Sequence, residues 1–164
     1  MLSTAVAGLI SDTHGFLRAE AVEALRGCDV IVHAGDVGAP EILERLETVA
    51  PVRAVRGNMD RGGWAADLGS TEVVELAGRR LYVIHDVGTL DLDPAAAGFD
   101  AVVYGHTHRP ASETRGGVLF VNPGAAGHRR FDLPVTVARL RSGPDGLEVE
   151  HVELVSDGSG EGVG

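Results

Sequence analysis

The chain has 164 residues, of which 44% are hydrophobic and 4% aromatic, so the composition fits one domain whose core is built from Val, Leu, Ala and Ile. The formal net charge of −10 disfavours non-specific binding to nucleic acid, which needs a basic surface. No apolar run is long enough to span a bilayer, and the single cysteine, Cys28, allows no internal disulfide. The N-terminal segment lacks the basic region of a signal peptide, so we expect a cytoplasmic protein.

The first half of the chain alternates between expected strands and expected helices. Residues 5–10, 29–36 and 52–55 are short apolar runs that predict buried strands. Residues 18–27 and 39–50 have the apolar spacing of amphipathic helices. This β-α-β-α-β order predicts a parallel sheet with right-handed crossovers.

The second half of the chain is richer in expected strands. Two strands are expected around a turn within residues 71–86, and apolar runs at 101–104 and 116–124 predict one strand each. Residues 134–155 alternate apolar and polar residues on both sides of a Gly-Pro-Asp-Gly turn, which indicates a hairpin. An α/β half followed by a strand-rich half predicts two stacked sheets with helices outside.

Five expected strands are each followed by side chains that can bind a metal ion. These side chains belong to Asp12, His14, Asp36, Asn58, His85, His106 and His108. In open α/β sheets, ligands bind outside the carboxyl ends of the strands. Such residues at five strand ends are hard to explain by chance, so the sequence predicts one common site.

The predicted ligand set has a definite chemistry. Carboxylate, amide and imidazole groups without a thiolate suit Mn²⁺, Fe²⁺, Zn²⁺, Ni²⁺ or Co²⁺ rather than an iron–sulfur cluster. Seven ligands are too many for one tetrahedral zinc, and they suit two ions about 3.5–4 Å apart that share a bridging carboxylate. Two divalent ions, less two aspartates and a bridging hydroxide, leave a charge of about +1, which attracts a phosphate ester.

The spaced motifs SDTHG, AGD, GNMD, IHD and YGHTHRP resemble those of the calcineurin-like metallophosphoesterases. The short length and the absence of an inserted cap are most similar to the small YfcE-type phosphodiesterase group. The segment NPGA at residues 122–125 resembles a late NPGS segment of that group. The resemblance extends from about residue 5 to about residue 155. The set of five motifs is specific, although each motif alone is weak.

The resemblance implies a role for each candidate ligand. Asp12, His14 and His108 would hold one ion. Asn58, His85 and His106 would hold the other, and Asp36 would bridge them. Asp36, Asn58 and His85 are also expected to act in catalysis. The implied reaction is hydrolysis of a phosphodiester by a hydroxide that bridges the two ions, most simply Mn²⁺, with Ni²⁺, Co²⁺, Fe²⁺ or Zn²⁺ as alternatives.

The resemblance also implies the architecture, which is an α/β fold built as a four-layer α/β-β/α sandwich. Two mixed sheets would be flanked by helices, with the dimetal site at the carboxyl ends of the strands. We expect one metallophosphoesterase domain over residues 1–155 and a disordered tail over residues 156–164. The implied partner is a small phosphate ester or phosphodiester, and a homodimer is expected by resemblance only.

Three positions depart from the family pattern. Larger members often carry a histidine, which contacts substrate or assists the leaving group, where this chain has Met59. Asp86 follows the strand-end histidine where glycine is usual, and Ala125 replaces the serine of NPGS. The loop that follows carries three further candidates for phosphate binding or for a solvated surface: His128, Arg129 and Arg130.

Several alternatives stay open at the level of sequence. A phosphomonoesterase or nucleotide hydrolase could use the same site. A non-catalytic scaffold is the alternative from another class, as in the retromer subunit of this fold, although here all seven ligand positions are filled. His33 is expected to be either a buried, hydrogen-bonded histidine or a support for a ligand. Asp60 is expected to form a turn or support a ligand rather than bind metal.

Overall fold

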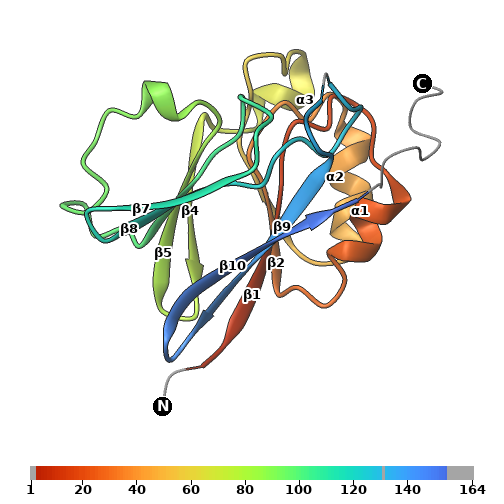
Figure 1. The fold of residues 1–164 in the computed structure, drawn as a ribbon. Coiled ribbons are helices and arrows are strands. Elements are labelled where there is room, and N and C mark those ends of the chain that lie inside the picture. The colour runs from red at the N-terminus through yellow and green to blue at the C-terminus, as the bar shows by residue number, and fades with distance from the viewer. Residues whose placement is uncertain (1–2, 131, 155–164) are drawn as a thin grey trace.

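The first of two five-stranded sheets contains the N-terminal strands and the C-terminal hairpin (Figure 1). The computed structural model describes residues 3–130 and 132–154. The strands run in the order β10-β9-β1-β2-β3. Their bounds are Ala5–Ile10 for β1, Val30–His33 for β2, Val52–Ala54 for β3, Thr136–Gly143 for β9 and Gly146–Glu153 for β10. The strands β1, β2 and β3 are parallel, while β9 and β10 form the predicted antiparallel hairpin.

The second sheet has the strand order β4-β5-β6-β8-β7. Its strands are β4 at Thr71–Leu76, β5 at Arg79–Ile84, β6 at Ala101–Val103, β7 at Ala111–Arg115 and β8 at Val118–Asn122. The central strands β5, β6 and β8 are parallel, and the edge strands β4 and β7 are antiparallel to their neighbours. Two mixed sheets are therefore confirmed, and β7 is a strand that the sequence pattern did not predict.

The main core lies between the two sheets. Side chains from the inner faces of both sheets are fully buried there, among them Leu9, Val32, Leu81, Val83 and Leu140. Since side chains alternate between the two faces of a strand, the other face of each sheet needs a cover of its own.

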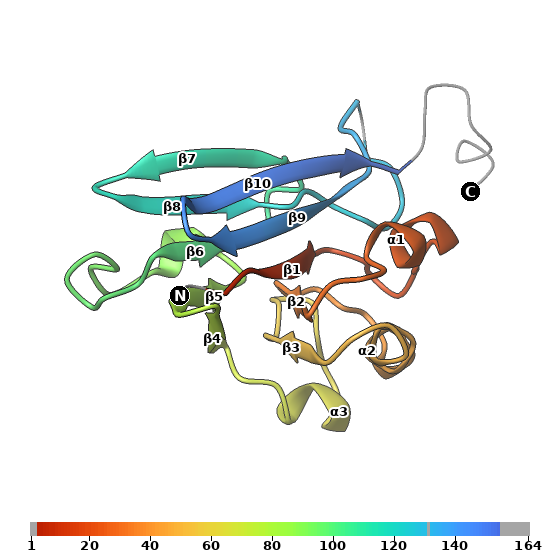
Figure 2. The same ribbon diagram turned by 90° about the horizontal axis from the view of Figure 1, so that it is seen from below.

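The helices cover the outer face of the first sheet only. Figure 2 shows α1, at Ala19–Ala24, and α2, at Pro40–Glu47, beside β1, β2 and β3. Both helices are shorter than the ranges expected from periodicity, and a short third helix, α3, spans Gly63–Ala66. Buried Ile31 and Leu46 belong to the core beneath this layer.

The outer face of the second sheet is covered by the connection between β5 and β6 instead of an α-helix. This connection contains a 3-10 turn, η1, at Val87–Thr89. Phe99 packs there against Tyr82 with ring centroids 5.0 Å apart, and Val102 and Phe120 complete the cluster. The sandwich is confirmed, but its second outer layer is a loop.

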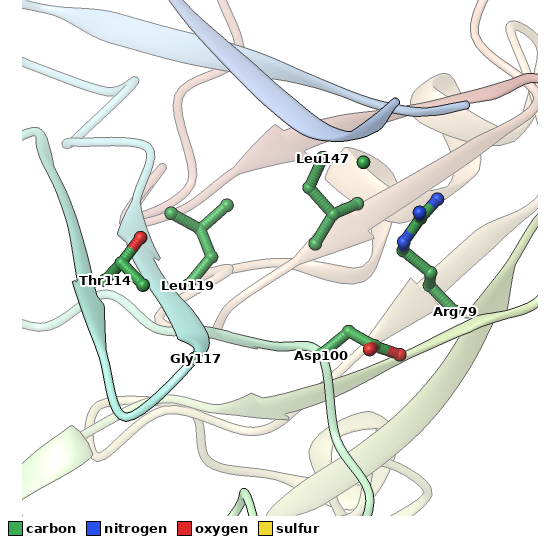
Figure 3. A pocket seen from close by; sticks show the side chains of 7 residues that line it. Arg79, Asp100, Thr114, Gly117, Leu119 and Leu147 are labelled. Atoms are coloured by element: carbon green, nitrogen blue, oxygen red, sulfur yellow. The ribbon is translucent and has the colours of Figure 1, made fainter. Parts of the chain in front are cut away.

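The two ends of the sandwich differ in chemistry. The predicted metal-binding residues follow the carboxyl ends of β1, β2, β3, β5 and β6, and contacts between them bring these ends together at one end of the sandwich. At the opposite end a cavity of about 270 Å³ lies between the sheets (Figure 3). There Arg79 Nη1 donates to Gly143 O at 2.8 Å and to Ser142 Oγ at 2.9 Å, which ties one sheet to the other.

The expected tail at residues 156–164 and the expected domain boundary at residue 155 lie outside the described residues. Within residues 3–130 and 132–154, no helix is long and apolar enough to cross a membrane.

Candidate metal centre

Backbone hydrogen bonds join the loops that carry the predicted ligands. Asp12 N donates to Gly35 O at 3.0 Å, and His14 N donates to Asp36 O at 2.9 Å. These bonds hold the loop after β1 against the loop after β2. Further bonds, among them those from Met59 N to Asp36 Oδ1, from His85 Nδ1 to Ala34 O and from His106 N to Asp12 Oδ2, bring in the loops after β3, β5 and β6.

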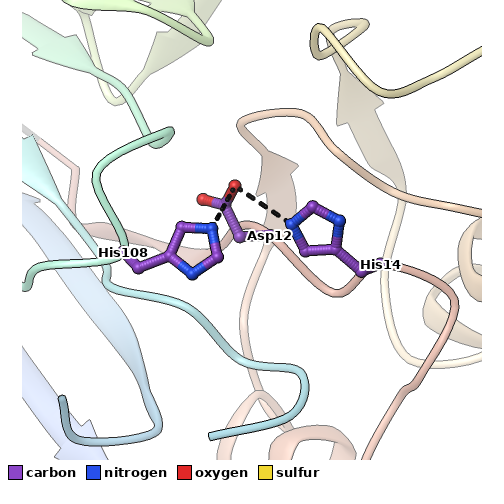
Figure 4. A group of neighbouring side chains, drawn as sticks. All are labelled: Asp12, His14 and His108. Atoms are coloured by element: carbon purple, nitrogen blue, oxygen red, sulfur yellow. Dashed lines mark ion pairs between the residues drawn. The ribbon is translucent and has the colours of Figure 1, made fainter. Parts of the chain in front are cut away.

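A first group of candidate ligands consists of Asp12, His14 and His108 (Figure 4). Asp12 Oδ1 lies 3.7 Å from His14 Nε2 and 3.4 Å from His108 Nε2. The Asp12 side chain is fully buried, whereas the His14 side chain keeps 23% of its surface exposed. One ligand atom from each residue lies within 4.8 Å of the other two, so the three could hold one ion.

The hydrogen bonding of this group leaves one carboxylate oxygen without a partner. Asp12 Oδ2 accepts from Ser11 Oγ at 2.7 Å and from His106 N at 3.1 Å. Asp12 Oδ1 is buried and has no hydrogen-bond partner among the described residues, and the same holds for His14 Nε2. A buried polar atom without a partner costs about 1–3 kcal/mol, and a cation at this point would remove that cost. The donor set therefore fits a metal ion.

A second group consists of Asp12, Asp36 and His85. Asp36 Oδ2 lies 3.3 Å from His85 Nε2 and 3.7 Å from His14 Nε2, so it stands between the two groups. Asp36 Oδ1 accepts from the Met59 backbone N at 2.8 Å. Because Oδ1 is occupied in this way, Oδ2 is the Asp36 atom available to a ligand on either side.

The imidazole of His85 is oriented by a backbone carbonyl. His85 Nδ1 lies 2.7 Å from Ala34 O, and since a carbonyl only accepts, Nδ1 carries the hydrogen. His85 Nε2 then faces Asn58 Oδ1 at 3.0 Å and Asp36 Oδ2 at 3.3 Å. When the imidazole is neutral, His85 Nε2, Asn58 Oδ1 and Asp36 Oδ2 are all acceptors, and they repel one another. Either a proton on Nε2 or a metal ion between the three atoms would remove this repulsion.

The electrostatics of the site favour charged carboxylates. Burial alone would raise the pKa of Asp12, but the neighbouring His108, His14 and Ser11 side chains hold it well below its ordinary value. Burial also opposes the charge on Asp36, while the His85 imidazole beside it lowers the pKa of that carboxyl. For His85, burial disfavours the charged form, but the hydrogen bonds with Asp36 and with Ala34 O and the charges of Asp12 and Asp36 together outweigh it and raise the pKa.

The structure places His106 at the rim of the site, outside both compact groups. Its ring centroid lies 5.2 Å from that of His85, and its Nε2 lies 3.9 Å from Asp86 Oδ2. Asp86 also accepts from Gly88 N at 2.9 Å and so caps η1. Six of the seven predicted ligands are thus brought together, with His106 next to them.

The backbone is strained at the predicted ligands. Six non-glycine residues among those described have a positive φ, and five are candidate ligands: Asp12 (55°), His14 (49°), Asp36 (56°), His106 (74°) and His108 (65°). Each such conformation costs about 1–3 kcal/mol and persists only where the surroundings impose it. Strain of this kind is concentrated at functional sites, and no pattern in the sequence showed it beforehand.

Two glycines let the loops approach closely enough to form the site. A Cβ on Gly57 would collide with the backbone N and the Oδ1 atom of Asp36. A Cβ on Gly105 would collide with Ser11 Oγ and would lie 2.7 Å from Asp12 Oδ2. Any larger residue at these positions would push a carboxylate away from its partners.

The buried His33 supports the site without facing it. Its Nδ1 accepts from Gly35 N at 3.1 Å, so Nε2 carries the hydrogen and donates to Thr13 Oγ1 at 3.0 Å. Thr13 Oγ1 donates onward to Val37 O at 2.7 Å. Burial lowers the pKa of His33 to about 4, which keeps the imidazole neutral. Both open interpretations therefore hold, since His33 is buried and hydrogen-bonded, and it positions the loop that carries the first group.

Asp60 is a support as expected. Its carboxylate is buried and accepts from three backbone amides, those of Val37 at 3.1 Å, Gly38 at 2.9 Å and Gly57 at 2.9 Å. These bonds join the loop that carries Asp36 to the loop that follows β3.

Asn122, at the end of β8, holds the loop that carries the last two histidines. Its Nδ2 donates to Gly105 O and to Thr107 Oγ1, both at 3.1 Å, and its Oδ1 accepts from Gly124 N at 2.8 Å. Asn122 is fully buried. The sequence signal for this residue was the NPGA segment, although it gave no role for the asparagine.

Comparison with known proteins identifies the family of this chain. The profile of the calcineurin-like phosphoesterase superfamily domain matches residues 6–143. The chain belongs to this superfamily. A probable metallophosphoesterase from Methanothermobacter thermautotrophicus is 36% identical over 155 residues, which cover 87% of this chain and 89% of the relative. The expectation of a metallophosphoesterase is thereby confirmed.

Two further proteins resemble the chain along most of its length. Phosphodiesterase YfcE from Escherichia coli is 36% identical over 155 residues, covering 79% of this chain and 84% of the relative. The crystal structure of a predicted phosphoesterase from Streptococcus pneumoniae has a TM-score of 0.76, with 23% identity and 96% coverage of both chains. Because only 23% of the residues are identical, the similarity to the Streptococcus pneumoniae structure shows the fold alone.

Proposed function

We propose that this metallophosphoesterase is a phosphodiesterase that depends on two divalent ions. The observation that carries the proposal is that hydrogen-bond acceptor atoms without a donor lie close together at the strand ends. In the part of the chain that the structure describes, Asp12 Oδ1 is buried without a hydrogen-bond partner, and Asp36 Oδ2 stands between the imidazoles of His14 and His85. This arrangement is costly in a protein that binds no cation there and favourable in one that does.

The proposed ligand assignment follows the two groups. One ion would be held by Asp12, His14 and His108, and Asp36 Oδ2 would bridge to the second ion. The second ion would be held by Asn58, His85 and His106. The distances support all of these except His106, whose imidazole would turn away from Asp86 to join the set.

Two ions bound in this way would supply Lewis-acid activation of water and polarise the phosphoryl oxygens. The chain's own residues would position that chemistry. Asp36, Asn58 and His85 meet where the second ion would lie, so they are the residues we propose to act in catalysis as well as in binding. Ala34 O fixes the His85 ring, and Met59 N fixes the Asp36 carboxylate.

The preference for diesters rests on two observations. The relative YfcE is named a phosphodiesterase. The Met59 side chain is 57% exposed beside the site, and a thioether cannot donate a proton to a leaving group. A phosphomonoesterase is the second candidate, because the ligand set alone does not select between the two ester classes.

The test is an activity assay on protein stripped with chelator. Bis-p-nitrophenyl phosphate and p-nitrophenyl phosphate are compared without metal and with Mn²⁺, Ni²⁺, Co²⁺, Zn²⁺ or Mg²⁺. Hydrolysis restored by metal and faster on the diester is the expected result, with Mn²⁺ proposed as the best ion. Asp36→Asn is the matched variant, which should bind fewer ions by elemental analysis. Failure of both esters with every ion would refute the enzyme and favour a scaffold.

The cytoplasmic location and the homodimer stay predictions. Cell fractionation and sedimentation analysis, respectively, would check them.

A further inference from the structure

A small cavity adjoins the candidate metal centre. It is a shallow, open pocket of about 170 Å³ and is lined by His106, Thr107, His108, Arg130 and Leu133. The first three residues form the loop after β6, and the last two belong to the connection between β8 and β9. One wall of the cavity is therefore the loop that carries two proposed metal ligands.

The opposite wall of the cavity carries the guanidinium group of Arg130. Arg130 is exposed, and its guanidinium has no hydrogen-bond or ion-pair partner within residues 3–130 and 132–154. Most other described arginines are engaged, as Arg79 is with Gly143 O, whereas Arg61 and Arg109 show no side-chain partner among the described residues and do not line this cavity. In a chain of net charge −10, an unpaired guanidinium beside a proposed phosphate site is a distinctive feature. The group binds carboxylates and phosphates through paired N–H donors.

Thr107 adds a second donor to the cavity. Its Oγ1 already accepts from Asn122 Nδ2 at 3.1 Å and from Arg109 N at 3.3 Å. Both acceptor positions of the hydroxyl oxygen are thus used, so its own hydrogen remains to be donated. The lining therefore offers a cation, a hydroxyl donor and the apolar side chain of Leu133.

The loop that carries Arg130 is anchored from behind. The His128 ring stacks on Phe16 with centroids 4.4 Å apart, and Gly127 O accepts from Arg18 Nε at 3.1 Å. Leu133 N donates to Arg130 O at 3.1 Å. These contacts give His128 a packing role and hold the lining residues next to the site.

We propose that this cavity binds one ester arm of the substrate and that Arg130 recognises a negatively charged group on that arm. The inference rests on the proposed function, since the scissile phosphate would lie at the adjacent metal centre. Pockets for drug-sized ligands measure about 300–1,000 Å³, so a cavity of about 170 Å³ fits a short arm. The substrate class is therefore a diester with a short arm that ends in a carboxylate or phosphate.

The test compares diesters that share the p-nitrophenol leaving group and differ in the other arm. These are methyl, 2-carboxyethyl and 2-phosphoethyl p-nitrophenyl phosphate, assayed with the holoenzyme. We expect kcat/KM to be about threefold to tenfold higher for an anionic arm than for methyl. In Arg130→Ala the ratio should fall close to one. The matched control is Arg109→Ala, which removes the same charge from an exposed residue next to His108 that does not line the cavity, and it should keep the ratio.

Equal kcat/KM for all three diesters in the wild type, or an unchanged ratio in Arg130→Ala, would overturn the subsite while leaving the phosphodiesterase intact. If none of the diesters is hydrolysed, the proposed function fails, and calorimetry then tests the subsite alone. The probes are ethyl phosphate and 2-carboxyethyl phosphate. Tighter binding of the second compound, lost in Arg130→Ala, would support the subsite, and equal binding would refute it. The ranking of the carboxylate and phosphate arms identifies which anion is preferred.

Discussion

Removing the Asp60 carboxylate tests whether this residue holds the metal-binding loops together. Asp60 accepts three backbone N–H groups, and two of these bonds, from Val37 N and Gly57 N, are buried. In Asp60→Ala both buried donors lose their partner, while Gly38 N can turn to water. A buried donor without a partner costs about 1–3 kcal/mol, so we expect the free energy of unfolding to fall by about 2–4 kcal/mol. For a chain of this length that lowers Tm by about 5–15 °C.

Asp60→Asn provides a graded comparison. An amide oxygen in the place of Oδ2 keeps the bonds from Val37 N and Gly57 N, whereas the amide nitrogen would face Gly38 N, donor to donor. This variant should lose about 1 kcal/mol and still bind two ions per chain, because Asp60 supports the ligands without being one. Asp67→Ala is the control, since Asp67 is exposed and its side chain has no partner within the described residues.

The assay is urea unfolding of the metal-free protein, followed by elemental analysis after reloading with Mn²⁺. The reasoning is refuted if Asp60→Ala unfolds within about 0.5 kcal/mol of the wild type, which is the range of an ordinary surface change. Loss of one ion in Asp60→Asn without loss of stability would instead make Asp60 a ligand.

Three further predictions concern single side chains. Burial lowers the pKa of His33 from 6.5 to about 4. Between these pH values the unfolded chain binds a proton that the folded chain does not. The free energy of unfolding therefore falls with falling pH, by up to about 1.4 kcal/mol per pH unit. Urea unfolding of metal-free His33→Gln should show a flatter pH dependence, and an equal slope would contradict the assignment. His106→Ala should abolish turnover with little change in Tm, because the side chain is exposed, and unchanged turnover would remove it from the ligand set. Met59→His should raise monoesterase activity relative to diesterase activity, and an unchanged ratio would exclude that position from substrate choice.

The sequence was most informative where the polypeptide leaves a buried strand. Apolar runs such as β2 and β6 are short, and the residues that follow them are polar and flanked by glycine. The carboxyl ends of parallel strands meet at one end of the fold, so a strand prediction is also a prediction of which side chains meet. The positions of Asp12, Asp36 and His85 could be predicted in this way.

Elements without such a pattern were missed. The edge strand β7 contains Ser112, Glu113, Thr114 and Arg115, all exposed, and it has no apolar alternation to detect. Charged edges of this kind limit pairing with other chains. Its partner β8 is buried and was predicted. The sequence likewise gave no sign that a loop would cover the outer face of the second sheet, because Phe99 and the leucines before it have no regular spacing.

The direction in which individual side chains point also could not be predicted from the sequence. The motif places His106 and His108 two residues apart, yet their side chains differ, since His108 is buried against Asp12 and His106 faces Asp86. Both residues have positive φ, which depends on contacts made by residues far away in the chain, such as Asn122 with Gly105. A local pattern cannot contain that information.

The residues that shape the metal centre are largely distinct from the residues that would bind the ions. His33, Asp60 and Asn122 make their hydrogen bonds to backbone and hydroxyl groups, and none of these bonds requires a cation. The loops can therefore hold their strained conformation before any ion binds, at a cost that the ions would partly offset by satisfying Asp12 Oδ1. It follows that the same fold would survive loss of its ligands, as a scaffold of this superfamily requires. Metal content, rather than fold or stability, is therefore the property that separates an enzyme from a scaffold here.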